Sequence, residues 1–394
     1  MGKRSKRWAL ALGLLLLGPI ALLLILAGLF ALSNRGLPSR SLMVDRLAER
    51  EKARLAEARH LRKGLGPLIW PGWDQVDIPV VLYDERYAFL TGYPDPPPGW
   101  VKVGTSETRG GPWELVPGDE VEGVAYYRQA LTSSAANPEA FTVRVGSRWA
   151  ASIPTLEWFQ IGLARRMREE LPAFLGPFFP YRIATGLFIG GSDGYISLQL
   201  HEAFHAYQGT LAPDRLVSAQ RVTAVEDDYR KRSADQRQAW QEELRLLAAG
   251  ASATSRDEVR SLATQFLTHR RERRSRHRLS DRLIDYERQR EWLEGLAKYA
   301  ELEAWRRASK TADYQPLPAL ADDPEFARYA GFDRKWSREL SEMRRSAGRE
   351  DIRFYYSGMA QAVALDRLMP AWKTRAFADS SWLETLLAEA VAAP

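Results

Sequence analysis

A long uncharged run near the N-terminus limits what this 394-residue chain can fold into. The 25 residues from Trp8 to Leu32 carry no charge and are almost wholly apolar. About 20 apolar residues in a helix cross a bilayer, whereas the apolar core of a cleaved leader has about 7–15 residues. The run therefore predicts an uncleaved transmembrane helix over residues 8–32, although Ala31 and Ser33 leave cleavage by a signal peptidase open.

The charges that flank this run predict its orientation. Four basic residues precede it and two follow it closely: Lys3, Arg4, Lys6 and Arg7, then Arg35 and Arg40. Because the more basic flank of a span stays in the cytoplasm, we expect residues 1–7 to form a cytoplasmic tail. The body of the protein is then expected in the periplasm or outside the cell.

The composition excludes several kinds of site. The chain contains no cysteine, so it has no disulfides, no thiolate metal ligands and no cysteine nucleophile. Its net charge is +6, but acidic residues are interleaved with the basic ones, so a nucleic-acid partner is not expected. The run "HRRERRSRHR" at 269–278 is typical of a solvated helix face, with contact to anionic lipid or to a protein partner as the alternative.

The remaining sequence predicts an α+β fold in several parts. Residues 33–65 are rich in charge and leucine and predict a juxtamembrane helix, which we expect to form a stalk. Short strand-like runs separated by glycine and proline predict a small mixed α/β region over 66–190. Residues 191–394 predict a mainly helical domain with a long helical-hairpin insertion at about 221–288.

Two local helix signals lie near the boundary between these regions. A helix is expected to open after Pro154, and residues 183–211 predict a strand, a glycine turn and then a helix. This last helix contains the sequence "HEAFH" at 201–205.

The histidines of this sequence suggest a metal site. His201 and His205 are four residues apart, so they share one helix face, and Glu202 lies beside them where a general base would be needed. Hydrolytic zinc takes three protein ligands, and without cysteine the third must be a histidine or a carboxylate. Metzincins have glycine and histidine where this chain has Gln208 and Leu211, which excludes that class. Two ordinary histidines on a helix are the alternative.

A family resemblance supplies a third ligand. The stretch "WLEGLAKYAELEAW" at 292–305 resembles the third-ligand helix of the gluzincin metallopeptidases, especially the membrane alanyl aminopeptidases, whose pattern is W-L-N-E-G-F-A-x-Y-x-E. One residue is missing before the glutamate. The resemblance implies a thermolysin-like zinc-peptidase domain in which Glu294 binds zinc and Glu301 supports the site. An ion-paired carboxylate on a helix face is the alternative for Glu294.

A second segment resembles the same family. The sequence "YYSGMAQAVALDRL" at 355–368 is similar to the family's Y-x-K-G-A segment, with Ser357 in place of the lysine. The resemblance implies that Tyr355 stabilises the oxyanion, with Tyr356 as its rival. The family's G-x-M-E-N segment, which captures a free amine, has no counterpart, so the resemblance does not extend to recognition of an N-terminus.

These features predict a membrane-anchored, extracytoplasmic zinc metallopeptidase that acts on peptides or proteins. His201, His205 and Glu294 are expected to hold Zn²⁺, with Glu202 as the general base and Tyr355 as the oxyanion donor. No other cofactor is expected. The alternative is a non-catalytic membrane-anchored scaffold with a vestigial zinc site, whose helical hairpin binds a protein partner.

Overall fold

The strand-like runs form one eight-stranded mixed sheet in the computed structural model of this chain. Its strands are β1 (Val80–Tyr83), β2 (Tyr87–Thr91), β3 (Trp100–Lys102), β4 (Thr108–Arg109), β5 (Glu114–Val121), β6 (Val124–Ala130), β7 (Phe141–Val145) and β8 (Arg148–Pro154). Their order is β4-β3-β7-β8-β1-β2-β6-β5, in which β1 and β8 pair in parallel and the other neighbours are antiparallel.

Helices account for most of the remaining chain. They are α1 (Lys3–Arg35), α2 (Glu49–Ile69), α3 (Leu156–Glu170), α4 (Tyr181–Ile189), α5 (Gly191–Leu211), α6 (Pro213–Arg221), α7 (Thr223–Ser252), α8 (Arg256–Arg276), α9 (Asp281–Arg290), α10 (Leu296–Lys310), α11 (Phe332–Arg345), α12 (Ile352–Leu368) and α13 (Leu383–Ala392). A π-helical segment, η2 (Glu291–Gly295), joins α9 to α10. The short 3-10 helices are η1 (Gly176–Phe178), η3 (Pro318–Leu320), η4 (Ser346–Gly348) and η5 (Trp372–Thr374).

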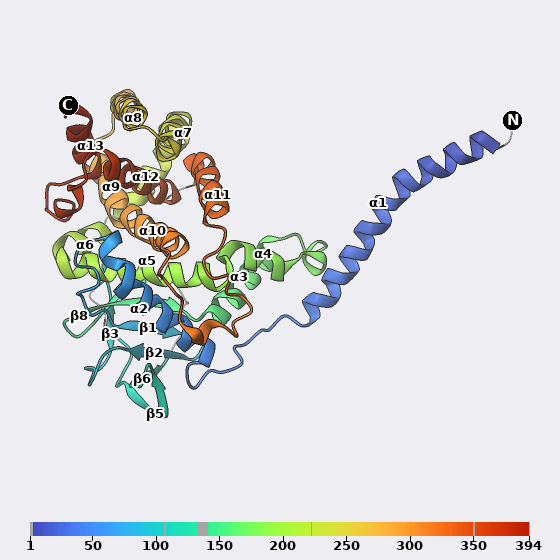
Figure 1. Cartoon of the computed structure of the whole chain (residues 1–394), viewed down its shortest axis with the longest axis horizontal. Helices are drawn as coiled ribbons and strands as arrows, with labels where there is room; N and C mark the ends of the chain where they lie inside the picture. The colour runs from blue at the N-terminus through green and yellow to red at the C-terminus, as the bar shows by residue number, and fades with distance from the viewer. Residues whose placement is uncertain (1–2, 106–107, 132–140, 222, 350, 394) are drawn as a thin grey trace.

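The structure describes most of the chain. The described residues are 3–105, 108–131, 141–221, 223–349 and 351–393, with the side chains of 3–17, 20, 141, 223, 224, 226 and 230–235 left out. Figure 1 shows the sheet at one end of the body, α5 and α10 in the middle, and α7, α8 and α13 at the other end. Helix α1 projects away from this body.

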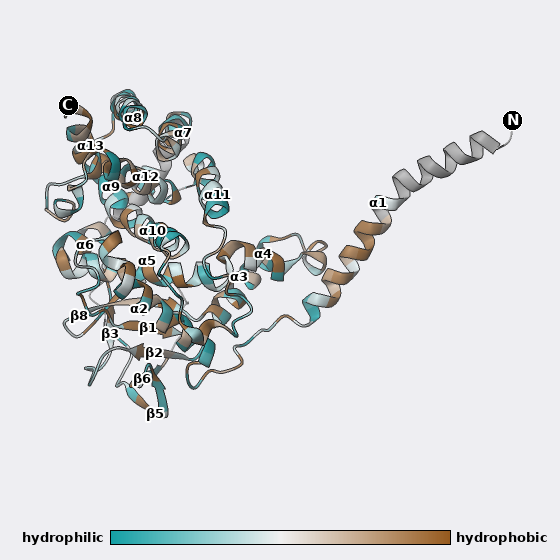
Figure 2. Ribbon diagram, viewed as in Figure 1, coloured by the Kyte–Doolittle hydropathy of each residue, from teal (hydrophilic) through white to brown (hydrophobic). Residues whose placement is uncertain are grey.

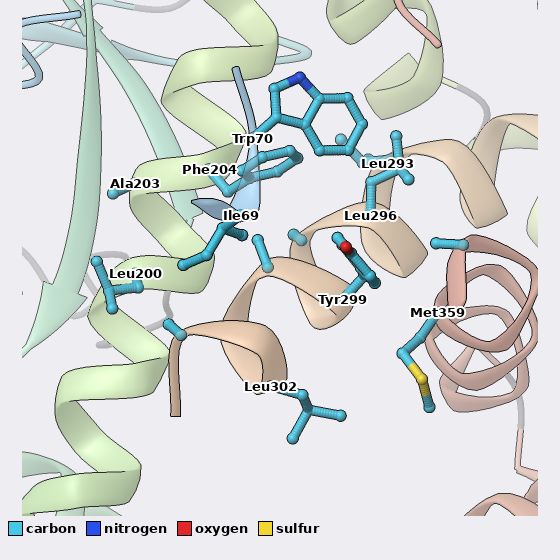
Figure 3. Close-up of a cluster of buried hydrophobic side chains, with 14 of the residues drawn as sticks. Ile69, Trp70, Leu200, Ala203, Phe204, Leu293, Leu296, Tyr299, Leu302 and Met359 are labelled. Carbon is cyan, nitrogen blue, oxygen red and sulfur yellow. The ribbon is translucent and has the colours of Figure 1, made fainter. Parts of the chain in front are cut away.

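The sheet is buried on two faces because its side chains alternate. Val80 and Leu82 of β1 belong to the main core under the helices, whereas Val81 and Tyr83 belong to a second core that includes Trp158 of α3. The main core continues between α5, η2, α10 and α12, where the apolar side chains interdigitate (Figure 3). This packing fixes α5 against η2 and α10.

The predicted fold class was wrong in its first element. No helix in the described part of the chain has the length and the apolar character that a bilayer crossing requires. The side chains of residues 8–17 and 20 of the predicted span lie outside the described ones. The described apolar run from Ala21 to Leu32 is about 18 Å long as a helix, which is shorter than the hydrocarbon core of a bilayer, about 30 Å. The predicted location of the protein stays a prediction.

The expected stalk is also different in the structure. Helix α2 lies inside the body, where it contacts α5 and α10 and buries Leu55 and Leu61. Several of its charged residues are also buried: Glu57 accepts hydrogen bonds from the Tyr314 hydroxyl at 2.7 Å and from the Leu317 amide at 2.8 Å. Much of the charge of this segment therefore serves buried polar contacts and not a solvated rod.

The boundary helices were predicted in part. Helix α3 opens after Pro154 as expected, and the Thr155 hydroxyl accepts a hydrogen bond from the Trp158 amide at 3.3 Å. The strand expected from residue 183 was wrong, because this segment belongs to helix α4. The expected glycine turn is confirmed, since Gly190 takes a φ of 84° between α4 and α5.

One buried carboxyl group predicts a pH dependence of stability. Asp84 follows β1, is 2% exposed, and accepts hydrogen bonds from the amides of Arg86 and Tyr87. Burial outweighs these bonds and raises its pKa from 3.8 to about 7. The folded state therefore binds more protons than the unfolded state between these two values, so the free energy of unfolding falls as pH rises through this window.

The expected fall in the free energy of unfolding across this pH window is on the order of 2–4 kcal/mol. We expect Asp84→Asn, which keeps the accepting oxygen, to remove it. Urea unfolding across the window measures it. Asp322→Asn, at an exposed position, is the matched control. Parallel pH profiles for the wild type and Asp84→Asn would contradict the assignment.

Candidate metal centre

Three buried side chains converge at the centre of the helical body. His201 and His205 lie on α5, and Glu294 lies on η2, so ligands 89 residues apart in sequence meet where these two segments pack. Their potential ligand atoms all lie within 4.8 Å of one another. This group can bind a metal ion.

The distances suit a tetrahedral ion. The His205 Nε2 atom is 3.3 Å and the His201 Nε2 atom 3.6 Å from the Glu294 Oε2 atom. Ligand atoms at about 2.0–2.1 Å from a tetrahedral zinc ion lie roughly 3.3 Å apart, which is close to both of these histidine–glutamate distances. Two imidazole nitrogens and one carboxylate oxygen form a donor set that zinc accepts.

The other ring nitrogen of His201 contacts a second carboxylate. Its Nδ1 atom lies 3.2 Å from Glu301 Oε2, and Lys298 Nζ lies 2.7 Å from the other oxygen of Glu301. A carboxylate can only accept, so Nδ1 donates and Nε2 is left to bind a metal. The supporting position predicted for Glu301 thus matches the geometry.

Gln208 performs the same task for His205. Its Nε2 group donates to the backbone carbonyls of Trp292 at 2.9 Å and Leu293 at 3.3 Å, which fixes the orientation of the amide. The Gln208 Oε1 atom then faces His205 Nδ1 at 2.8 Å and accepts a hydrogen bond from its N–H group. One side chain therefore selects the ring tautomer and ties α5 to η2.

Neighbouring positive charges keep the Glu294 carboxyl group ionised. Burial raises the pKa of Glu294, but Arg290 and His205 outweigh it, and its pKa lies well below the ordinary value. Arg290 pairs with the Oε1 atom of Glu294 at 3.1 Å, while Oε2 faces the histidines. This pairing leaves one carboxylate oxygen for a metal.

Glu202 lies beside this group as a buried carboxylate. Its side chain is 5% exposed, and its Oε2 atom has no hydrogen-bond partner among the described residues. Burial raises its pKa, and the charges of Glu294 and Glu301 add to this against the opposing effect of the two histidines. A carboxyl group with a raised pKa and an unpaired oxygen is suited to accept a proton from water.

The two candidate tyrosines point in different directions. The Tyr355 ring stacks on His201 with a centroid distance of 5.8 Å and an interplanar angle of 13°. Burial and the Glu294 charge raise its pKa well above 10, so its hydroxyl stays protonated and can donate. Tyr356 instead donates to Glu339 at 3.0 Å, away from the metal group. Of the two, the structure brings Tyr355 to the site.

A glycine pair determines how closely η2 and α12 approach. A Cβ atom added at Gly358 would lie 2.8 Å from the Gly295 Cα atom and still nearer the Glu291 carbonyl. Only glycine permits this approach. It places Glu294, one residue before Gly295, and Tyr355, three residues before Gly358, on the same side of the contact.

A buried ion network supports η2 from the helical hairpin. Arg270 pairs with Glu291 at 2.6 Å and with Glu243 at 3.0 Å, and Ser357 donates to Glu291 at 2.6 Å. Arg273 pairs with Glu243 and Glu287, each at 2.6 Å. The solvated face predicted for 269–278 was therefore wrong at Arg270 and Arg273, which are buried. The predicted protein partner on the hairpin stays a prediction.

Three functional residues were missed by sequence reasoning: Gln208, Arg290 and Glu291. Spacing offered a signal for two of them, since Gln208 is three residues after His205 and Arg290 is four residues before Glu294, which places each on the face of a ligand. Glu291 gave no such signal, because its partner Arg270 comes from another helix.

Metal binding should release a proton from His201. Burial lowers the pKa of this imidazole, but hydrogen bonds to Glu294 and Glu301 outweigh it and raise the pKa to about 10. A histidine must lose its proton to bind a metal, so the affinity for zinc should rise about tenfold per pH unit between about pH 6 and pH 9. Competition with a chelator at several pH values measures this.

His205→Ala should weaken zinc binding by more than roughly 100-fold. His269→Ala, an exposed histidine on α8, is the control and should bind one equivalent as the wild type does. Affinity that is independent of pH, or equal in the two variants, would contradict the site.

Gly358→Ala should disturb the metal group through the backbone. The added methyl group pushes η2 from α12, so we expect a loss of about 1–3 kcal/mol in the free energy of unfolding and a loss of roughly tenfold or more in zinc affinity. Gly162→Ala, where the Cβ atom meets open space on α3, is the control. Thermal unfolding with and without zinc measures both effects, and unchanged zinc affinity in Gly358→Ala would show that the contact does not position Glu294.

No protein-family model, curated protein or solved structure matches this chain. The resemblance to the gluzincins therefore stays a prediction.

Proposed function

We propose that this protein is a zinc-dependent hydrolase that cleaves peptide bonds, with His201, His205 and Glu294 as metal ligands. The observation that carries the proposal is the unpaired buried carboxylate of Glu202 beside the ligand group. A site that only stabilised the fold would not need a carboxylate with a raised pKa and a free oxygen at this position.

The donor set fits zinc, since two imidazole nitrogens and one carboxylate oxygen are a three-ligand set that catalytic zinc would accept. Bound zinc supplies Lewis-acid chemistry, which lowers the pKa of water and polarises a carbonyl group. Glu202 accepts the proton of the attacking water and returns it to the leaving amine. The Tyr355 hydroxyl donates a hydrogen bond to the developing oxyanion.

Residues around the ligands keep this arrangement in place. Glu301 and Gln208 orient the two imidazoles, and Arg290 occupies the second oxygen of Glu294. Because these contacts are buried, the ligands need little rearrangement when a metal binds. Such preorganisation is favourable for catalysis, since the cost of ordering is met on folding.

The second candidate function is a non-catalytic scaffold that keeps a metal site. The buried Arg270 and Arg273 favour a structural role for the hairpin, because their charges serve its packing. A structural role for these arginines does not account for the buried, unpaired carboxylate of Glu202. Hydrolysis is therefore the function that the site supports better.

Replacing the general base tests the proposal. Glu202→Gln should lower peptide hydrolysis by roughly 10²–10⁴-fold while zinc content stays at one equivalent. Tyr355→Phe should lower kcat by roughly 10²–10³-fold, whereas Tyr356→Phe is the matched control and should keep its rate. The assay uses the zinc-loaded full chain and a library of fluorescence-quenched peptides.

Equal rates for the wild type and Glu202→Gln would exclude this mechanism. Absence of cleavage by zinc-loaded wild type, together with a protein that co-purifies with it and is lost on Arg271→Glu, would favour the scaffold. Arg271 is suited to this test because it is exposed on α8 beside the buried Arg270.

A further inference from the structure

Exposed apolar side chains gather at one projecting part of the molecule. We call residues 172–188, which join α3 to α4 and include most of α4, the α3–α4 tip. Six large apolar residues in it are 45–72% exposed: Phe174, Leu175, Phe178, Ile183, Leu187 and Phe188. A folded protein rarely leaves so many apolar side chains together in water unless they meet a partner.

Helix α4 shows this most clearly. Its inward face consists of Tyr181, Thr185 and Ile189, which are buried at helical spacing. Its outward face carries Ile183, Leu187 and Phe188, where a surface helix would ordinarily have charged or polar residues. The helix is therefore apolar on the side that no described part of the chain covers.

The tip lies beside a second exposed apolar segment, at the end of α1. Figure 1 shows α4 and the loop before it extending from the body toward the base of α1. The Asn34 amide donates to the carbonyls of Pro177 and Phe179 at 2.9 Å, which fixes the end of α1 beside the tip. Leu24 and Leu29 on α1 are also exposed, and Figure 2 shows the described apolar part of α1 and much of α4 in brown.

Basic residues border the same surface. The exposed charged residues on α3 and α4 beside the tip are four arginines and two glutamates: Arg165, Arg166, Arg168, Glu169, Glu170 and Arg182. Their net charge is positive, and Arg182 also donates to the Gly36 carbonyl at 2.6 Å. Phenylalanine and leucine side chains bordered by arginine form the pattern that binds the boundary between headgroups and acyl chains, where anionic lipids attract the guanidinium groups. Arginine around an apolar centre also occurs at protein interfaces, but here the end of α1 is held beside the tip, and a lipid surface can cover the exposed apolar residues of both segments.

We propose that the α3–α4 tip docks on an anionic lipid surface, with Phe174, Leu187 and Phe188 inserted at the level of the acyl chains. The proposal does not depend on the metal centre or on the hydrolase activity. It gives the body a defined orientation on the lipid, with the sheet and the helical end away from the tip as drawn in Figure 1.

The cysteine-free sequence allows a direct test on the full chain. Phe188→Cys provides a single attachment point for an environment-sensitive nitrobenzoxadiazole label. Adding phosphatidylcholine–phosphatidylglycerol vesicles should shift its emission to the blue with a several-fold rise in intensity, and spin-labelled lipids should quench it. Leu115→Cys, 54% exposed on β5 in the native protein, is the matched control and should report water throughout.

Each outcome decides the proposal. Emission at position 188 that stays unchanged while the protein floats with vesicles would overturn it, since binding would then involve another segment. A blue shift without vesicles that grows with protein concentration would assign the surface to a second copy of the chain and would also overturn it. An equal response at position 115 would mean non-specific adsorption.

A second variant tests the affinity. Phe174→Ser, Leu187→Ser and Phe188→Ser combined should lower vesicle affinity by on the order of tenfold per side chain, with zinc binding unchanged. Leu115→Ser combined with Val124→Ser removes exposed apolar residues of the sheet and should leave affinity as it is. Equal losses in both sets would contradict a docking role for the tip.

Discussion

The contact between Gly295 and Gly358 is the constraint on which the metal group depends. Two backbones meet there without side chains between them, so η2 and α12 act as one rigid pair. Glu294 and Tyr355 then both contact the same histidine, His201. A π-helical hydrogen bond spans one residue more than an α-helical one, which changes the side chains that face α5. Irregular backbone at this point is therefore a requirement of the site.

Buried polar contacts add to the apolar packing that holds this arrangement. Gln208 joins α5 to η2, and Arg290 joins η2 to Asp351 just before α12, at 2.8 Å. Arg270 continues the network through Glu291 into the helical hairpin. Because removal of one partner would leave a buried charge unpaired, such networks favour one arrangement strongly over its neighbours.

Some features could be predicted from the sequence because their causes are local. The spacing of His201 and His205 follows from the period of a helix, and α3 opens where Thr155 caps it. Glu294 could be placed only through a family resemblance, since its distance to α5 is set by packing. The burial of Arg270 was missed because its acidic partners come from α7, η2 and α13, and the strand expected at 183 was missed because short apolar runs suit both strands and helices.

The buried carboxylate of Glu57 has a consequence for how the chain acquires its structure during synthesis. Its partners Tyr314, Leu317 and Tyr329 are made more than 250 residues later, and Arg54 likewise waits for Asp323. Until then Glu57 lacks these hydrogen bonds, and Arg54 has only Glu51 of its own helix as an acidic partner. The polar contacts of α2 are thus completed only when residues 314–329 have been made, so during synthesis this helix waits for its last partners and chaperones have access to it in that interval.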